Sequence, residues 1–414
     1  MFGRSHSRNE LLSLAAILLI QMGCGGGGGS KSDGRGPIAG NKITLSGRFA
    51  ATAAATSHGD ATTEAAAALP VATVIIFDTG GHYSTAPVSN GAFSIPVDAT
   101  APVALIFAGT ANNFLGYMTL GNGINSLPMT AMKNGTTSID LQTLTATGNV
   151  FTPSHNPLGV ELPLTAQEQT AFAQCNGLFA AVVQNPDLDG NGVIDLLEGK
   201  FYHAFVAYGV QAMRFNGALT PTVPANLALI YFNLTIMTND ASDSGPATVT
   251  GPAGSGLVNA ACTVTVRNSQ VYYSVYSNLG SSPTPIPVAG PYVFKTALGK
   301  TLTVNVPDQS AASARIVVAV PTVTLNAGNL IKVDWVYKLV GNNTVLSPAA
   351  MIDTLMVQVD HPLGSRRYDS SNLPSNIMSL TFTNQTLPWD SATCLYMAYN
   401  DVFGNNYVVS FNNP

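Results

Sequence analysis

The chain has 414 residues, a formal net charge of −5, 46% hydrophobic residues and only 9% charged residues. This length predicts two to four domains, and the hydrophobic content is sufficient for buried cores, which excludes a disordered protein. The sequence contains no basic blocks, so neither nucleic acid nor anionic lipid is favoured as a partner. Gly, Ala, Ser, Thr and Asn take the place of charged residues, as is typical of exported proteins rich in β-structure.

Residues 1–24 have the pattern of an export signal. Arg4 and Arg8 supply positive charge ahead of an apolar run, Leu11–Ile20, that only Ser13 interrupts. Ten residues are too few to cross a bilayer as a helix, so a processed signal is favoured over a permanent anchor.

The end of this run resembles the lipobox of bacterial lipoproteins. Gly23 and Cys24 fit that pattern, whereas Gln21 departs from it because the family prefers Leu there. The resemblance implies that Cys24 is diacylated and that residues 25–40, which are rich in glycine, tether the chain to the outer membrane. The mature protein would then face the periplasm or the cell surface. The alternative is a plain secreted protein in which the cysteine is incidental.

Three further cysteines follow. Cys175 lies on a predicted helix, where it is expected to be a buried small apolar residue. Cys262 and Cys394 both lie in the strand-rich C-terminal region, and in an oxidising compartment they could form a disulfide. The sequence does not settle this pairing.

Short strands separated by polar turns fill residues 41–147. The segment Val71–Phe77 is mostly apolar, and Asn90 with Gly91 predicts a hairpin turn before an alternating run that ends at Val97. Six or seven such strands in about a hundred residues predict a β-sandwich.

The order of the motifs ITLSGRF, PVATVIIFDTGG, VSNGAFSIPV, APVALIF and SIDLQTLT resembles the carboxypeptidase regulatory-like (prealbumin-like) sandwich. That resemblance implies a non-catalytic stalk or binding fold for residues 41–147. It carries over no functional residues.

The hydrophobic period changes near residue 165. Phe172, Cys175 and Phe179 recur at the spacing of a helical stripe, and the helix is expected to end at Asn185 because Pro186 follows.

A second stripe through Leu197, Phe201 and Tyr208 predicts another helix, so that residues 165–217 would form a helix–loop–helix unit.

The acidic loop between these segments, residues 187–198, is similar to the EF-hand calcium-binding motif. Calcium prefers six to eight oxygen ligands, and the loop offers oxygens at the required spacing, with Gly192 at the sharp turn. The expected ligands are Asp187, Asp189, Asn191, the backbone carbonyl of Val193, Asp195 through a water, and Glu198 in bidentate fashion. Ile194 is expected to plug the loop against its surroundings.

Two alternatives stand beside a calcium site. The loop could be an ordinary surface turn, since turns also collect Asp, Asn and Gly. Magnesium is less suited to a loop of this size and flexibility. A single loop favours a structural strut over a calcium sensor, with an affinity of about 10⁻⁴–10⁻³ M as in extracellular modules.

Strands return in the C-terminal region. The run Ile331–Leu339 alternates apolar and polar residues, which is typical of a half-buried strand. We expect two β-rich domains, residues 222–320 and 321–414, with a single larger unit as the alternative. The second domain loosely resembles fibronectin type III-like modules. The fold class is therefore mainly β, built of several sandwiches around a central helix–loop–helix insert.

The sequence contains no catalytic constellation. None of the six histidines forms an HExxH pair, and no nucleophile elbow is present. The favoured function is a non-enzymatic, calcium-binding, lipid-anchored structural or adhesive surface protein. A surface polysaccharide or another surface protein would be its partner. The second hypothesis is a carbohydrate- or polymer-binding surface module, in which Tyr272 and Tyr276 on one strand face would stack on sugar rings. Ordinary packing against a neighbouring strand or module is the alternative role of this pair. An extracellular hydrolase with a dispersed site is the remaining alternative.

Overall fold

The computed structural model describes a protein that is mainly β. The structure describes residues 42–50, 71–214, 229–267, 269–278, 288–308, 317–326, 330–339, 344–346, 351–360, 367–374, 377–382, 389 and 393–412. The predicted signal, Cys24 and the glycine-rich tether lie outside these residues. In the described part of the chain, no helix is both long and apolar enough to span a membrane.

The first eight strands form one antiparallel and parallel mixed sheet with the order β3-β2-β5-β6-β8-β7-β1-β4. Their bounds are β1 Lys42–Phe49, β2 Thr73–Asp78, β3 Tyr83–Pro87, β4 Ala92–Asp98, β5 Val103–Ala108, β6 Phe114–Met118, β7 Ser138–Thr147 and β8 Val150–Pro153.

This sheet folds back on itself, because its two end strands β3 and β4 contact each other. Strand β5 is buried along its whole length, and β4 buries Phe93, Ile95 and Val97 while the residues between them are exposed. The expected alternation in this segment is therefore confirmed, and it places the apolar face of β4 on the core.

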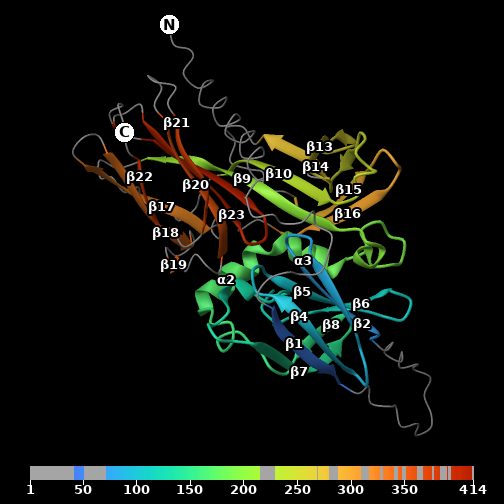
Figure 1. Cartoon of the computed structure of the whole chain (residues 1–414). Helices are drawn as coiled ribbons and strands as arrows, with labels where there is room; N and C mark the ends of the chain where they lie inside the picture. The colour runs from blue at the N-terminus through green and yellow to red at the C-terminus, as the bar shows by residue number, and fades with distance from the viewer. Residues whose placement is uncertain are drawn as a thin grey trace, which may run out of the picture.

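Two short helices follow the first sheet, α2 Ala166–Cys175 and α3 Gly177–Gln184. Helix α2 begins with a capping box in which Thr165 and Glu168 satisfy each other's backbone N–H groups. Helix α3 ends at Gln184, as expected from the Asn185-Pro186 pair. In Figure 1 the helices lie between the first sheet and the strands of the second half.

The predicted second helix of the helix–loop–helix unit is wrong. Residues Asp195–Glu198 form a single 3-10 turn, and Tyr202–Arg214 form the long strand β9. Strand β9 pairs with β10 on one side and with β24 on the other. These cross-strand hydrogen bonds, which no local pattern reports, outweigh the helical spacing of the apolar residues.

In the second half of the chain, the described residues form one eight-stranded sheet and two four-stranded sheets. The large sheet has the order β13-β14-β10-β9-β24-β23-β20-β21, and the smaller ones are β12-β11-β15-β16 and β17-β18-β19, with β22 paired to β18. The bounds are β10 Leu229–Thr238, β11 Thr248–Thr250, β12 Ala260–Ala261, β13 Thr263–Arg267, β14 Gln270–Asn278, β15 Gly290–Lys295, β16 Thr301–Val306, β17 Val317–Asn326, β18 Leu330–Leu339, β19 Thr344–Leu346, β20 Ile352–Asp360, β21 Arg367–Pro374, β22 Ser379–Phe382, β23 Cys394–Asp401 and β24 Asn406–Asn412.

The large sheet contains strands from both expected C-terminal domains. Strands β10, β13 and β14 come from residues 222–320, whereas β20, β21, β23 and β24 come from 321–414. The boundary near residue 320 therefore does not separate two independent sheets, and the alternative of a single larger unit describes the topology better. A continuous apolar core links this unit to the first sheet through the two helices.

Candidate metal centre

The acidic loop begins directly after α3, where Pro186 ends the helix. Its first carboxylate, that of Asp187, accepts hydrogen bonds from the backbone N–H groups of Asn191 at 3.1 Å and Gly192 at 2.8 Å. Gly192 adopts a φ of +88°, which L side chains rarely adopt, so glycine is suited to this turn. The chain is thus wound around the Asp187 carboxylate, as the predicted loop requires.

Three of the predicted ligands come together. Carboxylate oxygens of Asp187, Asp189 and Asp195 all lie within 4.8 Å of one another. Asp195 is only 3% exposed; its Oδ2 accepts a hydrogen bond from the Leu188 N–H at 2.8 Å, whereas its Oδ1 is buried without a hydrogen-bond partner. Buried polar atoms almost always have a partner, so an oxygen of this kind beside two carboxylates fits a cation.

The Asp195 carboxyl group is electrostatically destabilised in its charged form. Burial, followed by the neighbouring charges of Asp189 and Asp187, raises the pKa of Asp195 to about 7, although the hydrogen bond from Leu188 opposes this shift. A divalent cation would remove the penalty because it neutralises the carboxylates at close range. The donor set, hard oxygen atoms of carboxylates, fits calcium rather than a softer metal.

Asn191 and Glu198 stand apart from this group of three. The Asn191 Oδ1 accepts a hydrogen bond from the Val193 N–H at 2.8 Å, and its Nδ2 donates to the Glu198 Oε2 at 2.9 Å. The Lys200 ammonium donates to the same Glu198 oxygen at 2.7 Å and to the Asp189 Oδ2 at 2.8 Å. Sequence reasoning missed Lys200, which lies outside the predicted loop and reaches Asp189 across eleven residues.

Hydrogen bonds attach the loop to two sheets, and the chain then continues through Phe201 into β9 of the large sheet. The Ile194 N–H donates to the Asn112 carbonyl between β5 and β6, and the Thr303 N–H of β16 donates to the Leu188 carbonyl. The Phe201 N–H donates to the Asn239 side chain, directly after β10, at 2.8 Å. The side chain of Ile194 is fully buried, as predicted for the residue that plugs the loop. The loop therefore lies at a junction of the first sheet, a small sheet and the large sheet.

A second polar cluster, which the sequence did not indicate, lies near this junction in the turn between β23 and β24. The buried Asp401 Oδ1 accepts from the Phe403 and Asn405 N–H groups, and its Oδ2 accepts from the Asn405 amide at 2.9 Å and the Tyr407 hydroxyl at 3.0 Å. The Asn405 amide also donates to the Cys175 carbonyl at the end of α2 at 2.8 Å. Burial raises the pKa of Asp401 to about 7 against these hydrogen bonds. The cluster is fully satisfied within the protein, which indicates a structural role.

His203 in β9 belongs to the same region. Its Nε2 lies 2.8 Å from the Phe403 carbonyl, and its ring stacks between Phe201 and Phe205. Burial lowers the pKa of His203 to about 4, so the imidazole is neutral and Nε2 carries the donated proton. This environment is that of a structural histidine rather than a catalytic base.

The bridge between Cys262 and Cys394 that the sequence left open is not present. Cys262 immediately precedes β13 and Cys394 begins β23, and four strands lie between these two in the large sheet. Neighbouring strands are about 4.8 Å apart, so the two residues are separated by about 24 Å across the sheet alone. A disulfide requires Cα atoms within about 7 Å, which explains why no bridge forms. Cys175 is buried on α2, as predicted, and burial raises its pKa.

The candidate sugar-stacking face is only partly described. Tyr272 is half-buried, and its hydroxyl donates to Gln270 Oε1 at 3.0 Å. The side chain of Tyr276 lies outside the described residues. Val271, Tyr273 and Val275 occupy the opposite, buried face of β14, as the alternation predicted.

Comparison with known proteins does not place the chain in a family. No protein-family model matches the sequence, and no curated protein is similar to it. Among solved structures, a tetra-tandem repeat from the extending region of a large adhesion protein matches over 89% of this chain and 73% of its own length, at 12% identity and a TM-score of 0.16. A bacterial ice-binding adhesin of 1.5 MDa matches over 82% and 85%, at 10% identity and a TM-score of 0.19. A pullulanase from an Anoxybacillus species matches over 47% and 25%, at 10% identity and a TM-score of 0.13. Similarities this low carry no argument about this chain.

Proposed function

We propose that this chain is an exported, non-enzymatic structural or adhesive protein in which a calcium ion stiffens the joint between its β-units. The observation that carries the proposal is the position of the acidic loop. Its three clustered carboxylates belong to a segment that is hydrogen-bonded to the first sheet and to a small sheet and that leads directly into β9 of the large sheet. An ion that draws these carboxylates together would restrict both hydrogen-bonded attachments and the start of β9 at once.

The predicted ligands Asp187, Asp189 and Asp195 would hold the ion. Asp195 would contribute its buried Oδ1 either directly or through a water. Glu198 would add its carboxylate once its present hydrogen bonds are released, and Asn191 and the Val193 carbonyl would complete the oxygen shell. The ion would supply charge neutralisation and a fixed loop geometry, not chemistry on a substrate.

The test is the calcium dependence of thermal stability. At 10 mM calcium and an affinity of about 10⁻⁴–10⁻³ M, binding to the folded state should add about 1.4–2.7 kcal/mol, which corresponds to a rise in Tm of about 2–4 °C for a protein of this size. Glu198→Gln and Asp189→Asn should abolish the rise. The matched control is Asp140→Asn, because Asp140 is exposed on β7 and likewise accepts a hydrogen bond from a backbone N–H two residues further on.

An identical Tm of the wild-type protein in calcium and in chelator, together with no binding heat at millimolar calcium, would refute the proposal. Retention of the calcium effect by both loop variants would place the ion elsewhere.

The lipid anchor on Cys24 is part of the same proposal. Cys24→Ser should move the protein from the membrane fraction to the soluble periplasmic or secreted fraction and should prevent labelling by a fatty-acid analogue. Equal labelling of the wild-type protein and the variant would exclude lipid at this position.

For the partner we propose a surface polysaccharide or another surface protein. The half-buried Tyr272 ring on β14 supports the polysaccharide, because an aromatic face of this kind can stack on a sugar ring. Binding on a glycan array that is lost in Tyr272→Ala, but kept in Tyr83→Ala as a partly buried tyrosine on another sheet, would support this partner. No bound glycan would leave a protein partner as the favoured one.

A further inference from the structure

Lys200 follows the acidic loop in the chain, and its positively charged side chain lies against the carboxylates of the loop. Its Nζ lies 2.8 Å from the Asp189 Oδ2 and 2.7 Å from the Glu198 Oε2, so one ammonium group joins two of the predicted calcium ligands. All three side chains are shielded, with 23% of the Lys200 side chain exposed, 11% of that of Asp189 and 28% of that of Glu198. The contact is therefore stronger than a fully solvated ion pair.

The backbone of Lys200 is held by the fold, whereas its side chain is held at the ammonium group. The Lys200 N–H donates to the Asp195 carbonyl at 2.9 Å, and the next residue is held by Asn239 after β10. The ammonium group, in contrast, is held only by the two carboxylates in the part of the chain that the structure describes. Rotation of one side chain is thus sufficient to release both ligands, and the strand β9 that follows need not move.

One lysine does not neutralise the negative charge of the loop. The loop carries four carboxylates, those of Asp187, Asp189, Asp195 and Glu198, but the ammonium group contacts only two of them, and the buried Asp195 Oδ1 has no hydrogen-bond partner. A divalent ion bound bidentately by Glu198 would take the Oε2 that now accepts from Lys200, and its two positive charges would repel the ammonium group at this distance, so the lysine would be displaced.

We infer that Lys200 is a tethered counter-cation that holds the loop closed without metal and competes with calcium for Asp189 and Glu198. This inference rests on the proposed calcium site and deepens it. Binding is an exchange in which the ammonium group leaves for solvent as the ion enters. The lysine keeps the junction folded when calcium is scarce and lowers the affinity of the site, so that the ion is bound only at the high concentrations found outside cells.

Calcium titration calorimetry on the full chain tests this exchange. Lys200→Met removes the charge and keeps a linear side chain, and it should tighten the calcium Kd by about fivefold, the factor expected for loss of one partly shielded ion pair. Lys200→Gln, which keeps a hydrogen-bond donor, is a second variant with the same expected direction. The control is Lys295→Met, because Lys295 is exposed on β15 and its removal changes the net charge by the same amount. Its Kd should remain within about twofold of the wild-type value.

Thermal unfolding in chelator provides the second measurement. Without calcium, Lys200→Met should have a lower Tm than Lys295→Met because its loop carboxylates repel one another, and saturating calcium should restore it. An unchanged or weaker Kd in both Lys200 variants, beside a wild-type protein that binds, would overturn the inference and leave the proposed function standing. Absence of binding in all of the proteins would overturn both.

Discussion

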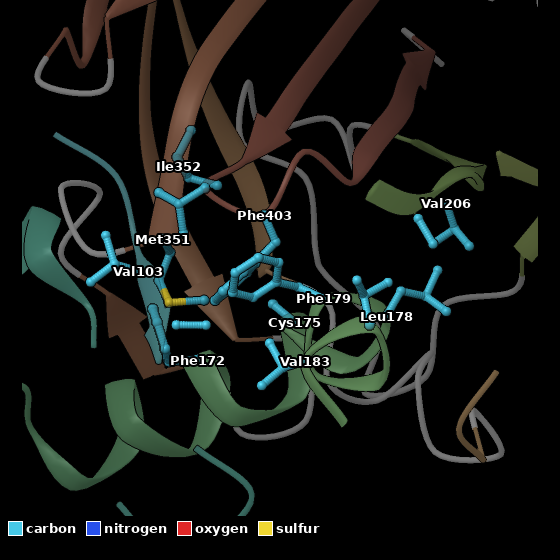
Figure 2. Packing of buried hydrophobic residues seen from close by; sticks show 14 of the residues in the cluster. Val103, Phe172, Cys175, Leu178, Phe179, Val183, Val206, Met351, Ile352 and Phe403 are labelled. Carbon is cyan, nitrogen blue, oxygen red and sulfur yellow. The ribbon is translucent and has the colours of Figure 1, made fainter. Parts of the chain in front are cut away.

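Truncation of Phe403 tests whether the two halves of the molecule are held together as the structure indicates. Phe403 lies in the turn between β23 and β24 and is 1% exposed. Its ring centroid is 4.7 Å from that of Phe172 on α2 and 5.9 Å from that of Phe179 on α3. Phe179 in turn lies 5.2 Å from Phe77 on β2. Figure 2 shows Phe403 directed toward the rings on the two helices. These rings link the large sheet to the first sheet.

The expected cost of Phe403→Ala is about 4 kcal/mol, because truncation of a fully buried phenylalanine costs about 3–5 kcal/mol. Two aromatic contacts of about 0.5–1.5 kcal/mol each are part of that loss. A domain is stable by only about 5–15 kcal/mol, so a loss of this size is a large fraction of the free energy of unfolding of either half. The backbone of the turn should survive, since Asp401 and Asn405 hold it by their own hydrogen bonds.

Differential scanning calorimetry is the appropriate assay. The wild-type protein should unfold in one main transition, and Phe403→Ala should split it into two as the halves become independent. Phe151→Ala is the matched control, because Phe151 is 7% exposed and packs on Phe49 and Phe107 within the first sheet. The control should lower the stability of the first sheet without releasing the large one. A single transition in Phe403→Ala, with a loss below about 1 kcal/mol, would refute the reasoning about this interface.

Three smaller changes test other parts of the structure. Burial lowers the pKa of His203 to about 4, so its contribution to stability is present above pH 6.5 and is lost as the pH falls toward 4. In denaturant melts, the wild-type protein should lose about 3 kcal/mol more of its free energy of unfolding than His203→Gln does between pH 7 and pH 4. Parallel pH profiles of the two proteins would contradict this. Gly81→Ala places a Cβ 2.9 Å from the Phe201 ring at a φ of +86° and should cost about 2 kcal/mol in chemical denaturation. Gly135→Ala has the same φ but open space, so an equal loss there would show that backbone strain, and not the ring, is responsible. Thr165→Ala removes the cap of α2 and should lower the stability by about 1 kcal/mol, whereas Thr165→Ser should retain most of it.

The acidic loop shows which parts of the candidate site can be predicted from the spacing of residues in the sequence. The sequence was sufficient to place Asp187, Asp189 and Asp195 together, because they belong to one short loop. That loop is held by hydrogen bonds between near neighbours, such as those from the Asn191 and Gly192 N–H groups to the Asp187 carboxylate. Lys200 could not be assigned in the same way. Its contact with Asp189 spans eleven residues and depends on the 3-10 turn that returns the chain toward the loop.

The sequence by itself determined what depends on near neighbours: the alternation that buries one face of β4, the end of α3 before Pro186, the acidic loop and the mainly β class. Only the tertiary structure decided that Tyr202–Arg214 is a strand and that β24 lies beside it, although about two hundred residues separate them in the chain. The physical reason is that the spacing of apolar residues indicates which side chains are buried. The choice between helix and strand in this segment depends instead on which backbone partners are available for hydrogen bonding. Those partners, β10 and β24, are supplied by distant parts of the chain, and the disulfide that the cysteines suggested is prevented by the same arrangement of strands.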